Sequence, residues 1–407
     1  GAGEVVGGAV DVYPNPVQDK KLPFEPDKMN ALLGTDVEPE KMLYYFGRLG
    51  LTYDADTNTL DVPSFRQDLN CMADLAEEVA RFYGYDNIPT TLPTGEATTG
   101  KLSFKLRVEE VARNIAEFCG FSQGMTYSFE SPKVFDKLLL DKDDPMRQAI
   151  QIMNPLGEDY SVMRTTSLNG MLTSLATNYN RRNESAGLFE VAKVYIPKAL
   201  PLTELPHEIP TLTMGMYGNM DFYDLKGIVE HLMHVLGMSK VAEYVTEKAL
   251  PWMHPGRTAS VIVNGESIGY LGEVHPAVLK NYGIGTRAYL AVLDMEKVIA
   301  NANRDVVYQA LPKFPALTRD IAMLVKEDVT VKEIADIIKK NGGAYLEEAK
   351  LFDVYQGAQI EAGYKSVAYS ITFRSAEKTL ADADIADAMD KILKGLAEEL
   401  GAQLRDK

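Results

Sequence analysis

Short periodic segments fill the first hundred residues, and most of them end at a stop signal. Two segments have the helical period and run into a glycine, as helices commonly do at their C-termini: Asp27–Leu33 before Gly34 and Glu38–Leu49 before Gly50. We therefore expect a small helix-rich unit over residues 21–96.

The two ends of this unit have different patterns. Val5–Tyr13 has a strand-like pattern, and we interpret residues 1–20 as the tail of a preceding domain. The stretch Pro89–Gly100 is rich in Pro, Thr and Gly, which predicts a linker.

The middle of the chain, residues 97–310, mixes helices and strands of unequal length. Apolar spacing predicts a helix over Ser103–Phe118, with its apolar positions at Leu106, Val108, Val111, Ile115 and Phe118. An Asn264-Gly265 pair between alternating segments predicts a β-hairpin. Hairpins among irregular strands favour an α+β fold with an antiparallel sheet over a doubly wound one. The other predicted elements are strands at Met125–Phe129, Ala149–Met153, Gly187–Tyr195 and Thr211–Tyr217, and helices at Leu168–Tyr179 and Leu225–Leu236.

Residues 312–407 have the clearest pattern, strand–helix–strand–strand–helix–strand, which is typical of a ferredoxin-like βαββαβ domain. Along one predicted strand, Val367, Tyr369, Ile371 and Phe373 alternate with polar or small residues, so one face should pack under helices and the other should be open. The predicted elements are Arg319–Val325, Val331–Lys340, Ala349–Tyr355, Ser366–Phe373, Ala383–Leu400 and Gln403–Arg405.

A predicted strand, Thr59–Val62, leads into an acidic segment that has two interpretations. Asp74, Glu77 and Glu78 share one face of a helix by their spacing, and Asp68 precedes them by a short loop. Asp74 would make a good N-cap, with Glu77 at the third helical position. The same carboxylates are also the hard oxygen ligands that Mg²⁺ takes. The two interpretations are compatible.

Composition narrows the class of protein. The chain has 407 residues, 46% hydrophobic and 25% charged, as in ordinary globular proteins with two or three domains. Two cysteines exclude a disulfide framework, so we expect a cytoplasmic location. A net charge of −16 argues against non-specific nucleic-acid binding over the whole surface, although not against a local basic patch. The chain opens without Met, so we expect it to be part of a longer protein.

Most enzyme motifs are absent: there is no phosphate loop, no nucleophile elbow and no His-Glu-x-x-His. Gly283-Ile284-Gly285 lacks the strand–turn–helix setting of a dinucleotide site. His231 and His234 are three residues apart on a predicted helix, where we expect a partly buried face rather than a zinc pair, and His254-Pro255 and His275-Pro276 suggest turns.

The sequence of the acidic segment resembles that of the B5 module of the phenylalanyl-tRNA synthetase β subunit family. The resemblance covers Val62-Pro63-Ser64-Phe65-Arg66 and Asp68, and continues from Asp74 to Pro89. It implies that Asp68, Asp74, Glu77 and Glu78 bind a magnesium ion near the contact with the α subunit.

The middle region resembles the catalytic-like domain of the same family. The matching segments are Met153–Thr165, Phe189-Glu190-Val191, His254-Pro255-Gly256-Arg257 and Gly272–Pro276. The resemblance implies a class II synthetase fold that has lost its active site. In agreement, the strand that should read Phe-Arg-x-Glu reads Leu188-Phe-Glu-Val, without an arginine to hold ATP phosphates.

The C-terminal region resembles the family's ferredoxin-fold anticodon-binding domain, on Phe314–Ala322, Leu351–Gly357, Lys365–Ala368 and Thr379-Leu380. The resemblance implies tRNA binding, with hydroxyl groups on strand positions and Arg or Lys on phosphates or bases. The same cations would otherwise line a solvated edge. The candidate RNA-facing residues are Arg319, Lys365, Ser370, Thr372, Arg374 and Lys378.

Together the resemblances predict the C-terminal half of a β subunit, without the N-terminal tRNA-binding and editing regions. Its α2β2 enzyme would use ATP to join phenylalanine to tRNA, while this chain would support α without performing the chemistry. One alternative is a stand-alone helix-turn-helix DNA reader, although its recognition helix would carry Asp74, Glu77 and Glu78 where Lys or Arg is needed. A free-standing hydrolase is a third hypothesis, but it lacks a nucleophile–base arrangement.

Overall fold

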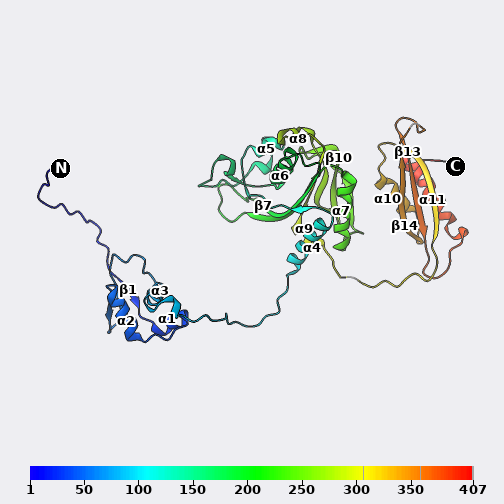
Figure 1. Cartoon of the computed structure of the whole chain (residues 1–407). Coiled ribbons are helices and arrows are strands. Elements are labelled where there is room, and N and C mark those ends of the chain that lie inside the picture. Colours follow the sequence, from blue (N-terminus) through cyan, green and yellow to red (C-terminus); the bar gives the residue numbers. More distant parts are fainter. Residues whose placement is uncertain (306, 358, 406–407) are drawn as a thin grey trace. The chain divides into compact units, whose positions relative to one another are not determined.

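The computed structural model of the protein describes residues 1–305, 307–357 and 359–405 (Figure 1). The chain divides into two compact units, residues 1–101 and 102–407, and each is described by itself. No helix in these described ranges is long and apolar enough to cross a membrane.

The first unit is a three-stranded sheet with helices, in the strand order β1-β3-β2. Both predicted helices are confirmed: each begins at a proline, Pro26 or Pro39, where the missing N–H costs no hydrogen bond. Gly34 ends the first in the left-handed conformation. The elements are β1 (Lys20–Pro23), α1 (Pro26–Leu33), α2 (Pro39–Arg48), β2 (Thr52–Asp54), β3 (Thr59–Val62), α3 (Met72–Tyr83) and the 3₁₀ turn η1 (Tyr85–Asn87).

The predicted strand at Val5–Tyr13 is wrong. These residues have no regular structure, and Val5, Val6 and Val10 are almost fully exposed. A strand needs a neighbour to accept its backbone hydrogen bonds, and within the described residues this segment pairs with none.

The second unit contains a seven-stranded sheet in the order β4-β7-β8-β12-β11-β10-β9. All its pairings are antiparallel except β4 with β7, so the predicted α+β class is confirmed. Its helices are α4 (Phe104–Phe118), α5 (Val134–Lys137), α6 (Leu168–Asn180), α7 (Phe222–Val235), α8 (Pro276–Tyr282) and α9 (Met295–Asn301), with the 3₁₀ turns η2 (Pro145–Arg147) and η3 (Glu158–Tyr160). Its strands are β4 (Ser122–Gln123), β7 (Ala186–Ile196), β8 (His207–Tyr217), β9 (Ala242–Thr246), β10 (Met253–Val263), β11 (Glu266–Val274) and β12 (Ala288–Asp294), beside a separate pair, β5 (Phe129–Glu130) and β6 (Val162–Met163).

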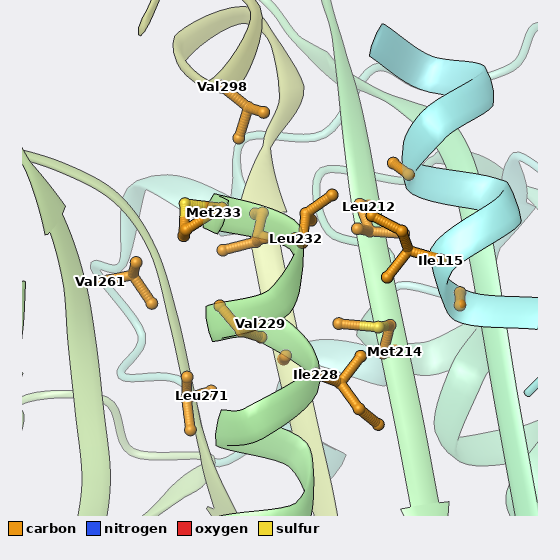
Figure 2. Packing of buried hydrophobic residues seen from close by; sticks show 14 of the residues in the cluster. Ile115, Leu212, Met214, Ile228, Val229, Leu232, Met233, Val261, Leu271 and Val298 are labelled. Carbon is orange, nitrogen blue, oxygen red and sulfur yellow. The ribbon is translucent and has the colours of Figure 1, made fainter. Parts of the chain in front are cut away.

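Each face of this sheet is covered by its own layer of helices. On one face, Val229 and Leu232 of α7 pack toward Leu271 and other strand residues, with α4 and α9 beside them (Figure 2). On the other face, Leu172 of α6 and Val278 of α8 pack with α5. The one tryptophan, Trp252, is buried in this second core, so its fluorescence reports on this region.

Several sequence predictions in this region need correction. Leu106 and Phe118 of α4 are 48% and 89% exposed, so the buried face of the helix is narrower than its spacing predicted. Of the strand predicted at Met125–Phe129, only Phe129 is in a strand, β5, and Ala149–Met153 contributes one isolated bridge. Met125, Tyr127 and Met153 are exposed in loops, although Ala149 is buried, and local pattern does not distinguish such loops from core strands.

The Asn264-Gly265 turn is confirmed, with both residues at positive φ as a type I′ hairpin requires. The helices and the two long strands predicted around it are confirmed within a few residues.

The C-terminal residues form a ferredoxin-like sheet in the order β14-β15-β13-β16, as the pattern predicted. β15 pairs with β13 in an uninterrupted register from Tyr364 to Phe373, whereas its pairing with β14 has two register shifts. Val367, Tyr369, Ile371 and Phe373 are buried under α10 and α11. The elements are β13 (Leu317–Lys326), α10 (Val331–Asn341), β14 (Leu346–Tyr355), β15 (Tyr364–Phe373), α11 (Asp382–Leu400) and β16 (Gln403–Leu404).

Candidate functional site

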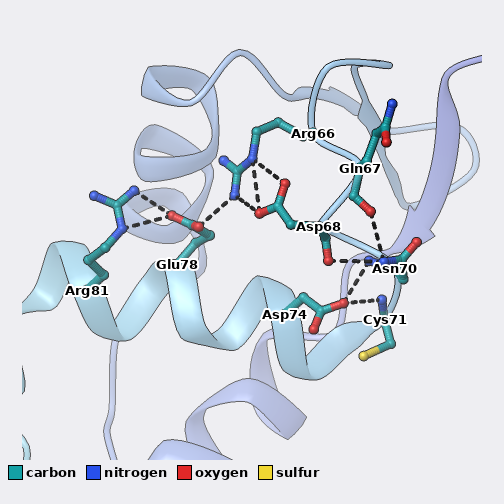
Figure 3. Close-up of polar contacts among 8 residues, drawn as sticks. All are labelled: Arg66, Gln67, Asp68, Asn70, Cys71, Asp74, Glu78 and Arg81. Carbon is teal, nitrogen blue, oxygen red and sulfur yellow. Dashed lines mark hydrogen bonds and ion pairs between the residues drawn. The ribbon is translucent and has the colours of Figure 1, made fainter. Parts of the chain in front are cut away.

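The acidic segment forms an ion network around Arg66 (Figure 3). The Nη2 atom of Arg66 donates to Asp68 Oδ2 and to Glu78 Oε1, each at 2.6 Å. The second oxygen of Glu78, Oε2, accepts from Arg81 one turn further along α3, at 2.5 Å. Arg66 therefore lies between the loop that carries Asp68 and the helix that carries Glu78.

Asp74 has a different role from the other carboxylates, because it closes the start of α3. One of its oxygens, Oδ2, accepts from the backbone N–H groups of Asn70 and Cys71, at 2.7 and 2.9 Å. The helix begins at Met72 with Cys71 as the N-cap, so the prediction of Asp74 as N-cap is wrong by three residues. Asp74 is the third helical residue, and Glu77 is exposed one turn later.

Hydrogen bonds favour the charged form of three of these carboxylates, Asp68, Glu78 and Asp74. Hydrogen bonds from Arg66 lower the pKa of Asp68 to about 2. Burial by itself would raise the pKa of Glu78, but hydrogen bonds from Arg81 and Arg66 outweigh it and lower the pKa. Backbone hydrogen bonds from Asn70 and Cys71 lower the pKa of Asp74.

Four carboxylates are a chemically suitable donor set for Mg²⁺, but in this arrangement they are not gathered around one point. The Arg66 guanidinium neutralises two of them, and Asp74 is committed to the helix start. In the part of the chain that the structure describes, no group of three or more His, Cys, Asp or Glu is arranged to hold a metal ion. The predicted ligands stay a prediction, and binding would first require Arg66 to move.

The strand that would carry ATP contacts in a class II synthetase is occupied by a buried internal network. Glu190 on β7 accepts from the backbone N–H and the hydroxyl of Thr126, at 2.9 and 2.8 Å. Arg164 Nη1 lies 3.5 Å from Glu190 Oε2, and both side chains are about 95% buried. This carboxylate is therefore bound within the protein.

The predicted RNA-facing residues do not share one face of the C-terminal sheet. Ser370 and Thr372 lie on the side of β15 opposite the helices and are partly exposed, opposite Asp320 and Thr318 of β13. Arg319 and Lys365 pair with the core residues Ile371 and Val325, so by strand alternation they belong to the helix-covered side.

The four predicted RNA-facing cations already have partners within this region. Arg319 pairs with Asp382 at the start of α11, and Lys378 pairs with Asp384. Two more pairings involve β14 and a loop: Arg374 Nε donates to Glu347 at 2.9 Å and Lys365 Nζ donates to the Glu327 carbonyl at 2.9 Å. Ser370 and Thr372 lie on the face opposite the helices, whereas these cations are engaged within the region, and RNA contact by all six residues stays a prediction.

Sequence reasoning assigned no structural role to Arg66, Arg81 or Arg164. Arg81 could have been found, because it is three residues after Glu78 on the same helix. The spacing of Arg164 from Thr126 and Glu190 carries no such signal. The histidines of α7, His231 and His234, are exposed, so the predicted partly buried face is wrong.

Three family models match the chain in order. The tRNA synthetase B5 domain matches residues 22–85, the phenylalanyl tRNA synthetase beta chain CLM domain matches 88–295, and the ferredoxin-fold anticodon binding domain matches 312–405. These three modules, on the sheets described above, define a subunit of an aminoacyl-tRNA synthetase.

Curated relatives agree over the whole chain. A phenylalanine–tRNA ligase beta subunit from Clostridium tetani is 47% identical over 99% of this chain, and one from Clostridium acetobutylicum is 44% identical over 99%. The chain belongs to the phenylalanyl-tRNA synthetase β chain family. It spans about half the length of these relatives, 51% of each. A solved pyrrolysyl-tRNA synthetase from Desulfitobacterium hafniense covers 50% of this chain and 74% of its own, with 15% sequence identity and a TM-score of 0.40. We draw no conclusion from this low structural similarity.

Proposed function

We propose that this chain is a non-catalytic part of a phenylalanine–tRNA ligase, in which it supports a catalytic α subunit and binds tRNA through its C-terminal sheet. The observation that carries this proposal is the match of three synthetase models in order along almost the whole chain. The assembled enzyme would join phenylalanine to tRNA with ATP, as an α2β2 heterotetramer in the cytoplasm. The three modules would occupy residues 21–96, 97–310 and 312–407, after a tail of a preceding domain at 1–20.

The absence of chemistry in this chain is supported by the environment of Glu190. A class II active site needs an arginine near this strand position that is free to hold phosphates. Here Arg164 is buried, and its Nε atom donates to the Lys193 carbonyl at 2.8 Å, so it has no freedom to reach a ligand.

A surface suited to the α subunit lies on the loops around β5 and η3. Met125, Tyr127, Met153 and Leu156 are 73–100% exposed. The ring of Tyr127 lies 5.7 Å from that of Tyr160 at the end of η3, so the two loops are adjacent. Exposed apolar side chains gathered in this way favour a protein partner.

The experiment that tests this function combines the chain with its cognate α subunit, with and without Mg²⁺, and measures the mass by light scattering. We expect a heteromeric complex, and we expect the chain alone to form no phenylalanyl-adenylate. Adenylate formation by the chain alone at a rate near that of the complete enzyme would contradict the non-catalytic role. If this chain did not associate with α under conditions in which the complete β subunit does, the supporting role would be contradicted.

We also propose that Asp68, Asp74, Glu77 and Glu78 bind Mg²⁺ when Arg66 is displaced, and this leads to a prediction for R66Q. Because Arg66 competes as a cation for Asp68 and Glu78, its loss should tighten binding of Mn²⁺, used as a spectroscopic substitute for Mg²⁺, by about tenfold or more. Titration followed by electron paramagnetic resonance measures the affinity directly.

The matched control is R48Q, which removes an exposed arginine of α2 in the same unit. It should leave metal affinity unchanged. If circular dichroism shows that both proteins are folded and R66Q and the unmodified chain have equal Mn²⁺ affinities, Arg66 does not compete with a metal ion for these carboxylates.

A further inference from the structure

Three segments that the proposed function does not use meet in one cavity beside the seven-stranded sheet. They are the His254–Arg257 segment of β10, the Gly272–Pro276 segment at the end of β11, and the Gly283–Arg287 loop before β12. The cavity has a volume of about 630 Å³, within the range of small-molecule sites. Its lining also includes residues of α6 and α8.

The charged groups of this cavity are mainly cationic. Arg257, Lys280 and Arg287 line it, against one carboxylate, Glu273. Glu273 is 96% buried in its side chain and is matched by Arg257, whose Nη1 lies 3.0 and 3.2 Å from its two oxygens. In a protein with a net charge of −16, this is a local positive surface.

Donors remain for a ligand after Glu273 is satisfied. Arg287 approaches Glu273 only through Nε, at 3.8 Å, and its side chain is 66% exposed. Lys280 is exposed and has no ion pair in the described ranges. A guanidinium fork beside an ammonium group suits a phosphate, which accepts bidentate hydrogen bonds.

Beside these charged groups and the polar residues His254 and Thr286, part of the lining is apolar. Tyr179, Leu279 and Ile284 line the cavity. A Cβ atom on Gly285 would lie 2.6 Å from the Tyr179 hydroxyl, so glycine there lets the tyrosine lie close to the loop. An aromatic ring beside cations is the combination that proteins use to bind a base with its phosphate.

We propose that this cavity binds a phosphate monoester with an aromatic body, of the nucleotide class. The phosphate would lie between Arg287 and Lys280, and the base would lie against Tyr179 and Ile284. Arg257 would act indirectly, because it neutralises Glu273, the one carboxylate among the described lining residues. The site shares no residue with the predicted Mg²⁺ ligands or with the predicted RNA-facing residues.

The test titrates the whole chain, without an α subunit or metal, with AMP, adenosine and inorganic phosphate by calorimetry and Trp252 fluorescence. AMP should bind saturably at about millimolar concentration or below, and about tenfold more tightly than adenosine. R287Q should weaken AMP binding about tenfold, with no loss of folding because its side chain is exposed. R107Q, which removes an exposed arginine of α4, should not change it.

Two further arms identify the source of the phosphate. If a short 5′-phosphorylated RNA binds, its 5′-hydroxyl form does not, and AMP binds only weakly, the cavity recognises a phosphate monoester and RNA is its source. Equal binding of AMP and adenosine, no effect of R287Q, or binding of N-acetylphenylalanine in place of AMP would overturn the proposal.

Discussion

Replacement of Arg164 by leucine is expected to destabilise the region around the seven-stranded sheet by about 3–5 kcal/mol, because it leaves the Glu190 carboxylate buried without a cation. Arg164 also donates to Thr126 and to the Lys193 carbonyl, so these acceptors lose a partner as well. Urea unfolding followed by Trp252 fluorescence measures this region selectively, since the chain has no other tryptophan.

The control for this variant is K193Q, on the same strand as Glu190. It breaks an exposed pair with Glu208, which should contribute less than about 1 kcal/mol. Addition of E190Q to the R164L background should recover part of the stability, since the unpaired charge is then gone. A loss below 1 kcal/mol for R164L would mean that Glu190 obtains its stabilisation from Thr126 alone.

Replacement of Glu130 by glutamine should remove a pH-dependent loss of stability in the same region. Glu130 is 96% buried, and within the described residues its Oε1 atom has no hydrogen-bond partner. Burial raises its pKa to about 7 from 4.5, against a hydrogen bond from Asn169 and the charge of Arg164. The folded state therefore holds a proton that the unfolded state has released between these two values, and stability is lost as the pH rises from about 4.5 through 7.

At pH 8 the ionised Glu130 should cost about 3 kcal/mol, and at pH 4.5 almost nothing. E130Q should therefore be more stable than the unmodified chain at pH 8 and similar at pH 4.5, as followed by Trp252 fluorescence. Comparison of the two proteins at each pH cancels the contributions of all the groups that they share. The control E158Q, at an exposed site on η3, should show no such difference between the two pH values. If the difference in stability between E130Q and the unmodified chain were the same at both pH values, the titration of Glu130 would be contradicted.

The elements that could be predicted from the sequence are those specified by local chemistry. The Asn264-Gly265 pair specifies a hairpin because both residues tolerate positive φ. The alternation along β15 identified its helix-covered face, although Ser366 and Ala368 on the opposite face are buried as well. The start of α3 was placed too late because Cys71 is not a typical N-cap, whereas Asp74 is a typical one.

The interactions that could not be predicted join residues that only the fold brings together. Arg66 reaches Glu78 across 12 positions because the intervening loop turns back on the helix. Arg164 meets Thr126 across 38 positions, through β6 and the loop after β4. The family resemblance supplied the four acidic residues as a set, but not the arginine that lies between two of them.

In the C-terminal sheet, the strand β15 pairs differently with its two neighbours, β13 and β14. The ten pairs between β13 and β15 leave no room for an added residue, since one insertion would turn every following side chain to the opposite face. The β14 edge already contains two irregularities, between Leu346 and Glu348 and between Leu351 and Asp353. Where this sheet has gained or lost residues during evolution, we expect the changes to have accumulated along β14 and its loops, and the spacing between β13 and β15 partners to have stayed fixed.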